Sequence, residues 1–410
     1  MFDYTENKTP RLRFNEFEGA WSKLSLDEIS IVNMGQSPSS KSYNQSGEGV
    51  LLIQGNADIK DRLTNPRQWT SEPTKKCKIG DLILTVRAPV GTIAKSKHNA
   101  CIGRGVCSIS NNSKSDIEYL YQALVKYEKK WVRLEQGSTF TAVSGNDIRG
   151  FKIGIPSIAE QQKIAEFLSS VDKKIQLLEK KKEQLALYKK GVMQKIFSQE
   201  IRFKDDNGNS FPDWEIKTMG DIIKFLSDYT ANGSFGALKE NVKYFSSPNY
   251  AALVRTTDLE KNFFEPKRFT DKRGYDFLKK TSLFGGEIIM ANVGSIGKVY
   301  KAPNKYEGLM TLAPNTYVLK FHNNIDEEFI FQLMLRIEFK YKLLSMVGSS
   351  TLKAINKSNL RSIKIELPFY NEQKKIADFL SAIDNKIEIT LTQIEKTKKF
   401  KKGLLQQMFV

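Results

Sequence analysis

The sequence contains an internal duplication, and this repeat limits the possible folds of the chain more than any other feature. Residues 156–198 align without a gap with residues 368–410, at an offset of 212, and 18 of the 43 positions are identical. The identities include Pro156/Pro368, Glu160/Glu372, Gln161/Gln373, Phe167/Phe379, Asp172/Asp384 and Gly191/Gly403. A chain that repeats a segment of this length is expected to fold as two related parts.

The segments before these two stretches repeat more faintly. Trp21 matches Trp214, Gly80 matches Gly286, and the offset grows from 193 to 206 to 212, so the second copy carries insertions. We predict an N-terminal segment at 1–20, a globular domain at 21–155, a helical spacer at 156–200, a linker at 201–213, a second globular domain at 214–367 and a second spacer at 368–410. The two spacers are similar in sequence, whereas the two globular domains have diverged. This favours a common scaffold role for the spacers and a ligand-recognition role for the globular domains.

Both spacers show the heptad spacing of long helices that pair through an apolar seam. The seam residues are Ile164, Leu168, Val171, Ile175, Leu178 and Leu185 in the first spacer, and Ile376, Leu380, Ile383, Ile387 and Ile394 in the second. Lys182 and Lys189 interrupt the first seam, whereas Thr390, Thr397 and Lys401 interrupt the second. Because these polar interruptions differ, we expect each helix to pair with the other rather than with itself.

The spacers are long enough to separate two globular domains. A helix of about 39 residues is roughly 60 Å long, which exceeds one turn of DNA at about 34 Å. Glu160 and Glu372 lie in the first turns, where a carboxylate favours the helix dipole. The pair therefore has the dimensions of a ruler between the two domains.

Both globular parts mix strand-like runs with helical patterns, which predicts an α+β fold. The strand-like runs lie at 49–53, 81–86, 286–291 and 316–321, and the helical patterns at 116–134 and 326–344. Polar stretches between them, such as 36–44 and 204–210, indicate loops and turns.

Charge and composition narrow the classes of partner. Lys and Arg number 64 against 46 Asp and Glu, for a net charge of +18, which favours a polyanion such as nucleic acid. No basic start precedes an apolar run, and no stretch reaches the roughly 18 apolar residues of a membrane span, so we predict a cytoplasmic location. Cys77, Cys101 and Cys107 lack metal-site spacing and are expected to be reduced.

Catalytic motifs are missing from the sequence. An adenine methyltransferase would carry Asn/Asp-Pro-Pro-Tyr, and the nearest string, Ser247-Pro-Asn-Tyr250, lacks it. Residues 293–298 lack the spacing of a phosphate loop. Residues 212–217 resemble a nuclease signature, but the acids are crowded into one segment, so we interpret it as a turn anchored by Trp214. With only two histidines, a metal site or a catalytic triad is disfavoured. We predict a chain without catalytic or metal residues.

Polar and aromatic loop residues can donate to phosphates and base edges. For any single residue, an ordinary surface loop is the alternative interpretation. By residue type and repeat position, the candidates for DNA contact are Lys41, Ser42, Tyr43, Gln54, Asn56, Arg87, Thr139, Thr141, Asn146, Lys239, Arg255, Thr256, Asn292, Ser295, Ser350, Lys353 and Asn356.

With the repeat established, the chain resembles the specificity (S) subunits of type I restriction-modification systems. The residues that carry the resemblance are Gly-Ser-Thr at 137–139, Ile148 to Pro156 and Glu160-Gln-Gln-Lys-Ile164, each of which recurs in the second half. The resemblance implies two target-recognition domains, each reading half of a split DNA site, and an antiparallel coiled coil with pseudo-two-fold symmetry that docks two methyltransferase subunits. Those partners would bind S-adenosylmethionine, restriction subunits would use ATP and Mg, and this chain would bind no cofactor.

Two other functions stay open at this point. One is the specificity subunit of a related restriction system whose partner fuses nuclease and methylase. The other is a coiled-coil scaffold with no role on DNA, which salt-dependent and sequence-selective DNA binding would exclude.

Overall fold

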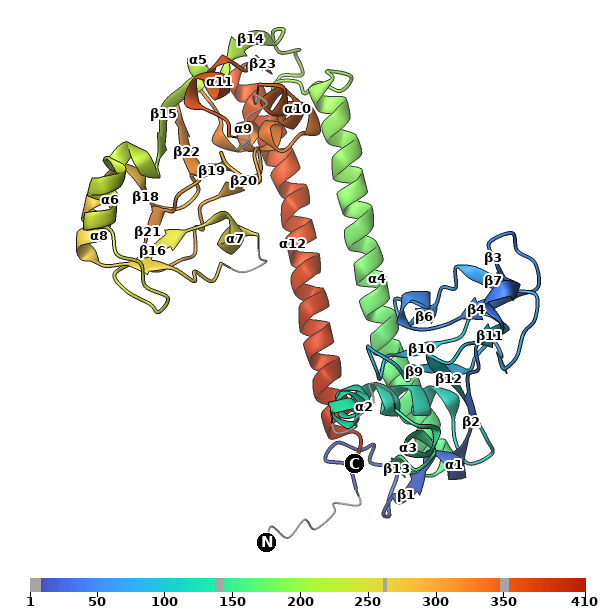
Figure 1. The fold of residues 1–410 in the computed structure, drawn as a ribbon. Helices are drawn as coiled ribbons and strands as arrows, with labels where there is room; N and C mark the ends of the chain where they lie inside the picture. Colours follow the sequence, from blue (N-terminus) through green and yellow to red (C-terminus); the bar gives the residue numbers. More distant parts are fainter. Residues whose placement is uncertain (1–8, 137–142, 261–263, 347–353) are drawn as a thin grey trace. The chain divides into compact units, whose positions relative to one another are not determined.

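The chain divides into two units, which we describe separately. The computed structural model describes residues 9–136, 143–260, 264–346 and 354–410. The first unit holds the chain up to residue 182 together with 389–410, and the second unit holds 183–388. Two long helices, α4 (Ile158–Phe197) and α12 (Tyr370–Gln407), are each divided between the units (Figure 1). Each unit therefore contains one globular part, the start of one long helix and the end of the other.

The first globular part is mixed α and β. Its strands are β1 (Ser22–Ser25), β2 (Ser30–Met34), β3 (Tyr43–Asn44), β4 (Val50–Ile53), β5 (Ile59–Lys60), β6 (Leu63–Thr64), β7 (Gln68–Thr70), β8 (Lys76–Cys77), β9 (Leu82–Thr85), β10 (Ile93–Lys95), β11 (Ala100–Ile102), β12 (Val106–Asn111) and β13 (Lys152–Ile155). Its helices are α1 (Leu26–Ile29), α2 (Ile117–Gln136) and α3 (Gly145–Arg149), with short 3-10 turns η1 (Ser40–Ser42) and η2 (Asn56–Asp58). They form sheets in the orders β1-β13, β2-β12-β9-β10-β6-β5 and β3-β7-β4-β11-β8.

Among the described residues, the second globular part repeats this plan with fewer strands and more helices. Its strands are β14 (Glu215–Thr218), β15 (Ile223–Asp228), β16 (Ala251–Val254), β17 (Phe269–Thr270), β18 (Ser282–Leu283), β19 (Ile288–Ala291), β20 (Val299–Lys301), β21 (Leu309–Leu312), β22 (Thr316–Phe321) and β23 (Lys364–Leu367). Its helices are α5 (Met219–Ile222), α6 (Phe235–Asn241), α7 (Thr256–Leu259), α8 (Lys272–Phe277), α9 (Glu327–Met334), α10 (Ile337–Ser345) and α11 (Lys357–Ser362), with 3-10 turns η3 (Tyr229–Asn232) and η4 (Lys279–Thr281). The sheets run β14-β23, β15-β22-β19-β20 and β17-β16-β21-β18.

The predicted α+β class is confirmed, with one correction to a helix. The pattern at 326–344 predicts one helix, but the structure has α9 and α10, separated at Leu335 and Arg336. Arg336 has an extended backbone, with φ −68° and ψ 146°, and no Pro or Gly marks the break in the sequence. The break changes the direction of the helix axis. In α10, Phe339 and Leu343 are buried while Ile337 is exposed.

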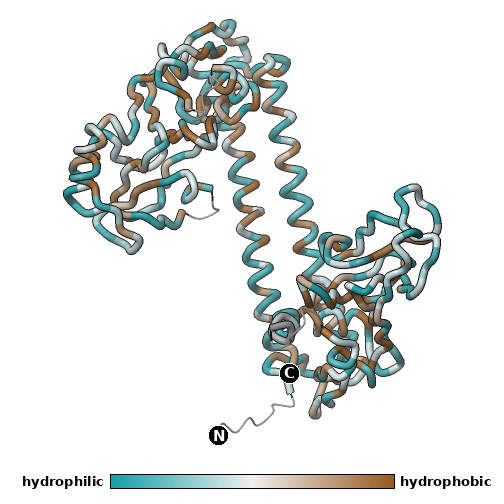
Figure 2. Tube along the Cα trace, in the orientation of Figure 1, coloured by the Kyte–Doolittle hydropathy of each residue, from teal (hydrophilic) through white to brown (hydrophobic). Residues whose placement is uncertain are grey.

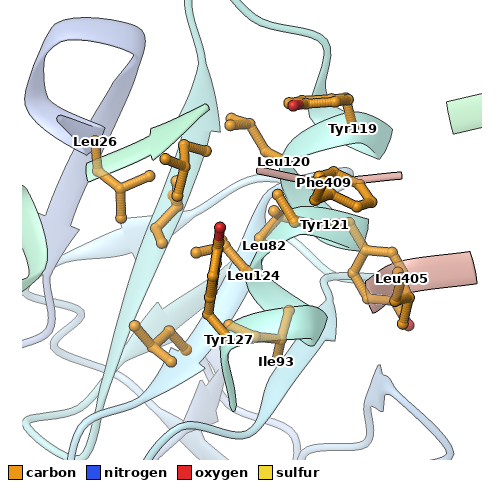
Figure 3. Close-up of a cluster of buried hydrophobic side chains, with 14 of the residues drawn as sticks. Leu26, Leu82, Ile93, Tyr119, Leu120, Tyr121, Leu124, Tyr127, Leu405 and Phe409 are labelled. Carbon is orange, nitrogen blue, oxygen red and sulfur yellow. The ribbon is translucent and has the colours of Figure 1, made fainter. Parts of the chain in front are cut away.

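The core of the first unit is completed by the far end of the chain. Leu82, Ile93, Leu120 and Leu124 pack together between the central sheet and α2, as Figure 3 shows. Phe409 enters the same cluster from beyond the end of α12, with its ring 5.2 Å from that of Tyr119 and 6.5 Å from that of Trp21. The first unit therefore cannot bury its core without residues that lie at the end of the second repeat.

The second unit uses the end of the first long helix in the same way. Phe197, the repeat equivalent of Phe409, is buried with its ring 5.5 Å from Phe329 and 6.2 Å from Trp214. In Figure 2, brown apolar and teal polar residues alternate along both long helices, as expected where only one face is packed. Each globular core is thus closed by the helix that began in the other repeat.

Within each unit the two helix portions are joined by a Lys–Asp pair. Lys401 donates to Asp172 at 2.6 Å in the first unit, and Lys189 donates to Asp384 at 2.6 Å in the second. Lys398 also pairs with Glu179. Residue numbers therefore increase along α4 as they decrease along α12, so the two helix portions of the first unit run antiparallel. The lysines at 189 and 401 are equivalent by the repeat, and at this position the prediction that polar interruptions differ is wrong.

The predicted seam residues lie in the interior of the units. Those buried in the first unit are Ile164, Leu168, Val171, Ile175 and Ile394, and those buried in the second are Ile376, Leu380 and Ile383. Leu178, Leu185 and Ile387 are half-buried. Most of these side chains also touch the globular cores. The buried members pack within their own unit, so a partner subunit that docks on these helices must use their exposed faces.

Candidate nucleic-acid interface

Three loops of the first unit are tied together at the ends of their strands. They are the loop after β4 (54–58), the loop after β9 (86–92) and the turn between β11 and β12 (103–105). The Gly103 amide donates to the Ile53 carbonyl at 2.8 Å, and the Val86 amide donates to the Gly105 carbonyl at 2.9 Å. These backbone hydrogen bonds hold the three loops in one fixed arrangement.

The three loops surround what we call the loop groove. It consists of two cavities of about 610 and 740 Å³ that share Gln54, Gly55, Asn56 and Ala88. Its lining is mainly polar and carries the side chains of Tyr43, Gln54, Asn56, Arg67, Arg87 and Arg104. Amide and guanidinium groups of this kind are the usual donors to base edges and phosphates. The groove can therefore hold a polar, negatively charged ligand such as nucleic acid.

Hydrogen bonds position the amide and carboxyl groups of the groove. The backbone N–H of Gln54 donates to the Asp58 carboxylate at 2.8 Å, and the side-chain amide of Gln54 donates to the side-chain oxygen of Gln68 at 3.3 Å. Arg67 lies 3.5 Å from Asp58, whose side chain is buried. Asp58 thus fixes the turn and neutralises Arg67 in part, and the cationic character of the groove comes mainly from Arg87 and Arg104.

Gly105 is required by the close approach of two loops. A Cβ added at Gly105 would lie 2.1 Å from the Gln54 carbonyl oxygen, which is far inside contact distance. We therefore expect Gly105→Ala to displace the loop at Gln54 and to lower stability by about 1–3 kcal/mol. Thermal unfolding of the full chain measures the loss. Gly191→Ala is the control, because a Cβ there meets nothing within 4 Å and alanine favours the helix. Equal stability of the two variants would contradict this account.

The second unit ties its equivalent loops with the same backbone bonds. The Ala313 amide donates to the Val254 carbonyl at 3.0 Å, and the Asn292 amide donates to the Asn315 carbonyl at 3.2 Å. These bonds correspond to those of Gly103 and Val86 in the first unit. The loop scaffold is therefore repeated, while its side chains differ.

The structure brings together four of the candidate residues in the first unit. Tyr43, Gln54, Asn56 and Arg87 all line the loop groove. Ser42 is buried, and its hydroxyl is bonded to Ser39 and Thr70, so we withdraw it as a DNA contact. The other first-unit candidates lie apart from the groove lining: Lys41 on η1 and Asn146 on α3 are exposed, and Thr139 and Thr141 fall outside the described residues.

In the second unit the candidates divide in the same manner. Arg255, Thr256, Asn292 and Ser295 lie in the two tied loops that follow β16 and β19. Arg255, however, is engaged with Asp258 through two hydrogen bonds of 3.0 and 2.7 Å and is less available than its residue type predicts. Of the others, Lys239 is exposed on α6, Asn356 caps α11 by accepting from the Asn359 amide, and Ser350 and Lys353 fall outside the described residues.

Two ion pairs that involve buried glutamates were not predicted from the sequence. Arg13 forms two hydrogen bonds of 2.8 and 2.7 Å with Glu160, and Arg202 forms two of 2.9 and 2.8 Å with Glu372. Both glutamates are buried, so their interpretation as helix-dipole residues misses their main contact. The signal in the sequence is an Arg-Phe pair at 13–14 and 202–203, too short to stand out at an offset of 189.

The cysteines and the potential metal ligands bear on whether the described residues hold a nucleophile or a metal site. Cys77, Cys101 and Cys107 are free and buried, and burial raises the pKa of the Cys107 thiol to about 12. A thiol with such a pKa is protonated near neutral pH and is a poor nucleophile. Among the described residues no cluster of three metal-ligating side chains occurs. Within the same ranges, every helix is too short or too polar to cross a bilayer.

The fold resembles two solved structures. One is the crystal structure of a type I restriction-modification system S subunit from M. genitalium, with a TM-score of 0.61 and 17% identity over 98% of this chain and 99% of that one. The other is a chain from a structural study of complex assembly and conformational transition of the type I R-M system, with a TM-score of 0.54 and 15% identity over 96% and 98%. At 17% and 15% sequence identity, these comparisons show a similar fold and nothing further.

The family follows from the sequence comparison. The model of the type I restriction modification DNA specificity domain matches residues 18–187 and 212–399. The chain therefore belongs to this family and carries its domain twice, which confirms the predicted resemblance to type I specificity subunits.

Two relatives from Methanocaldococcus jannaschii extend the comparison. The first, assigned provisionally as the type I restriction enzyme MjaX specificity subunit, is 38% identical over 183 residues, which is 44% of this chain and 43% of that one. That match spans less than half of the relative's length. The type I restriction enzyme MjaIX specificity subunit is 25% identical over 95% of this chain and 92% of its own.

Proposed function

We propose that this chain is the non-catalytic DNA-reading subunit of a type I restriction-modification complex. Each globular part reads one half of a two-part DNA site. The helices α4 and α12 form an antiparallel coiled coil, related by an approximate two-fold axis, that docks two methyltransferase subunits and sets the gap between the halves. The partner subunits supply the chemistry, with S-adenosylmethionine in the methyltransferases and ATP and Mg in the restriction subunits, and this chain binds no cofactor.

One observation carries the proposal. Both units tie the same three loops with the same backbone hydrogen bonds, yet the side chains on those loops differ between the units. A constant scaffold with variable loop residues is what two independent sequence readers require. The net charge of +18 supports a polyanionic ligand over an uncharged scaffold role.

Sequencing of methylated bases in a host tests this function. With the chain and its methyltransferase partners present, we expect methylated adenines within one motif of two blocks and a fixed gap. Omitting the chain is expected to abolish the methylation, and the purified chain without partners is expected to transfer no methyl group. Methylation of the same motif without the chain, or methyl transfer by the chain alone, would refute the proposal.

A further inference from the structure

Within the described residues, two arginines of the loop groove have no acidic partner, in contrast to three arginines of the same unit. Arg13, Arg62 and Arg67 each pair with a carboxylate. Arg87 and Arg104 are exposed, and no ion pair holds either of them within the described residues. An arginine that is neither paired nor buried keeps its donors available for a ligand. Both line the same cavity of about 610 Å³.

Hydrogen bonds hold the backbone at these two arginines. Arg104 stands between Gly103 and Gly105, and its amide donates to the Ser37 hydroxyl at 3.1 Å. Arg87 follows Val86, which is bonded to Gly105 at 2.9 Å. Backbones joined in this way lie roughly 5 Å apart, so the two side chains start close together. That spacing suits neighbouring base pairs, which are stacked at about 3.4 Å.

The chemistry of the guanidinium group selects one base. Guanine presents two acceptors, O6 and N7, in the major groove, and the fork of arginine donates to both. Adenine presents one acceptor and one donor at the same edge, so a guanidinium cannot pair with it in this way. A phosphate also accepts from arginine, but it carries no sequence information.

The second unit lacks both arginines at the equivalent positions. The bond from Asn292 to Asn315 corresponds to the bond from Val86 to Gly105, so that Val293 stands where Arg87 does and Pro314 where Arg104 does. Neither Val nor Pro can donate from its side chain to a base. Any recognition by these two arginines therefore belongs to the first unit alone.

We infer that Arg87 and Arg104 read guanine in the half-site addressed by the first unit, and that the second unit reads its half-site by other contacts. The inference rests on the proposed function, because it requires that the loop groove faces DNA. It assigns a base type to one block of the motif and names the side chains responsible.

The test compares Arg104→Ala, Arg104→Gln and Arg87→Ala in the complete complex with its methyltransferase partners. Methylome sequencing is expected to show guanine in the first block of the unaltered motif. Each alanine variant should lose roughly ten- to a hundredfold discrimination at one guanine while the second block stays unchanged. Arg104→Gln should shift the preference at that position toward adenine, since glutamine pairs with the adenine edge. Arg11→Ala, an exposed arginine outside the groove lining, is the charge-matched control and should leave the motif intact.

Three results would overturn the inference. The first is a first block without guanine. The second is an unchanged motif in both alanine variants. The third is an equal loss of binding affinity for all DNA sequences. In that case the slope of log affinity against log salt concentration would be smaller by about one, which marks a phosphate contact. Failure of the proposed function is distinguishable, because then no block would depend on the first globular part at all.

Discussion

Phe409→Ala is expected to destabilise the first unit by about 3–5 kcal/mol, although Phe409 lies at the far end of the chain from most of that unit. The ring of Phe409 is 5% exposed and packs against Trp21 and Tyr119. Removing the ring opens a cavity beside Trp21 and Tyr119 in the core of the first unit. Amide hydrogen exchange on the full chain, resolved by peptide, is expected to rise in β9, β12 and α2 while β19 and β22 keep their protection.

The repeat provides the matched control for this prediction. Phe197→Ala removes the equivalent ring from the second unit and should produce the opposite pattern of exchange. Phe400→Ala, on an exposed face of α12, should change the stability by well under 1 kcal/mol. If Phe409→Ala loosened both units equally, or neither, the closure of each core by the other repeat's helix would be contradicted.

Asp172→Lys is expected to separate the helix portions of the first unit. Lys401, whose side chain is 12% exposed, would then face a second cation in place of its partner. Burial already lowers the pKa of Lys401, and only the hydrogen bond and charge of Asp172 oppose that effect. Leaving a largely buried cation without its partner costs about 3 kcal/mol or more. Chemical denaturation of the full chain measures this loss.

Exchange of the two charges distinguishes a specific pair from general damage. Asp172→Lys combined with Lys401→Asp should recover much of the lost stability, because the pair is restored in reverse. Glu179→Lys is the control, because its pair with Lys398 is exposed on both sides and is worth less than about 1 kcal/mol. No recovery in the double variant would argue against a role for this pair in holding α4 to α12.

Much of the fold could be predicted because periodicity and repetition can be read directly from the sequence. The offset of 212 located α4 and α12, and short apolar runs located β4, β9, β19 and β22. Both signals need only neighbouring residues or a direct alignment. The break between α9 and α10 was missed because no helix-breaking residue marks it, and the burial of Phe339 after the break is known only from the structure.

The candidate site was less accessible, because it depends on contacts between distant loops. Residue type suggested Gln54, Asn56 and Arg87, but nothing local marks Arg104 as their neighbour. Ser42 is of a residue type that can contact DNA, but it is buried and its hydroxyl is hydrogen-bonded to Thr70. Hydrogen bonds between separate strands decide these cases, and they become visible only once the sheets are assembled.

The most direct test of the central claim is to replace residues 21–155 with the equivalent domain of another specificity subunit and to sequence the methylated motif. If each globular part reads its own DNA block, one block should change to that of the donor protein, and the other block should stay as it was. If both blocks change together, or neither does, the two parts do not read DNA independently, and the account is wrong.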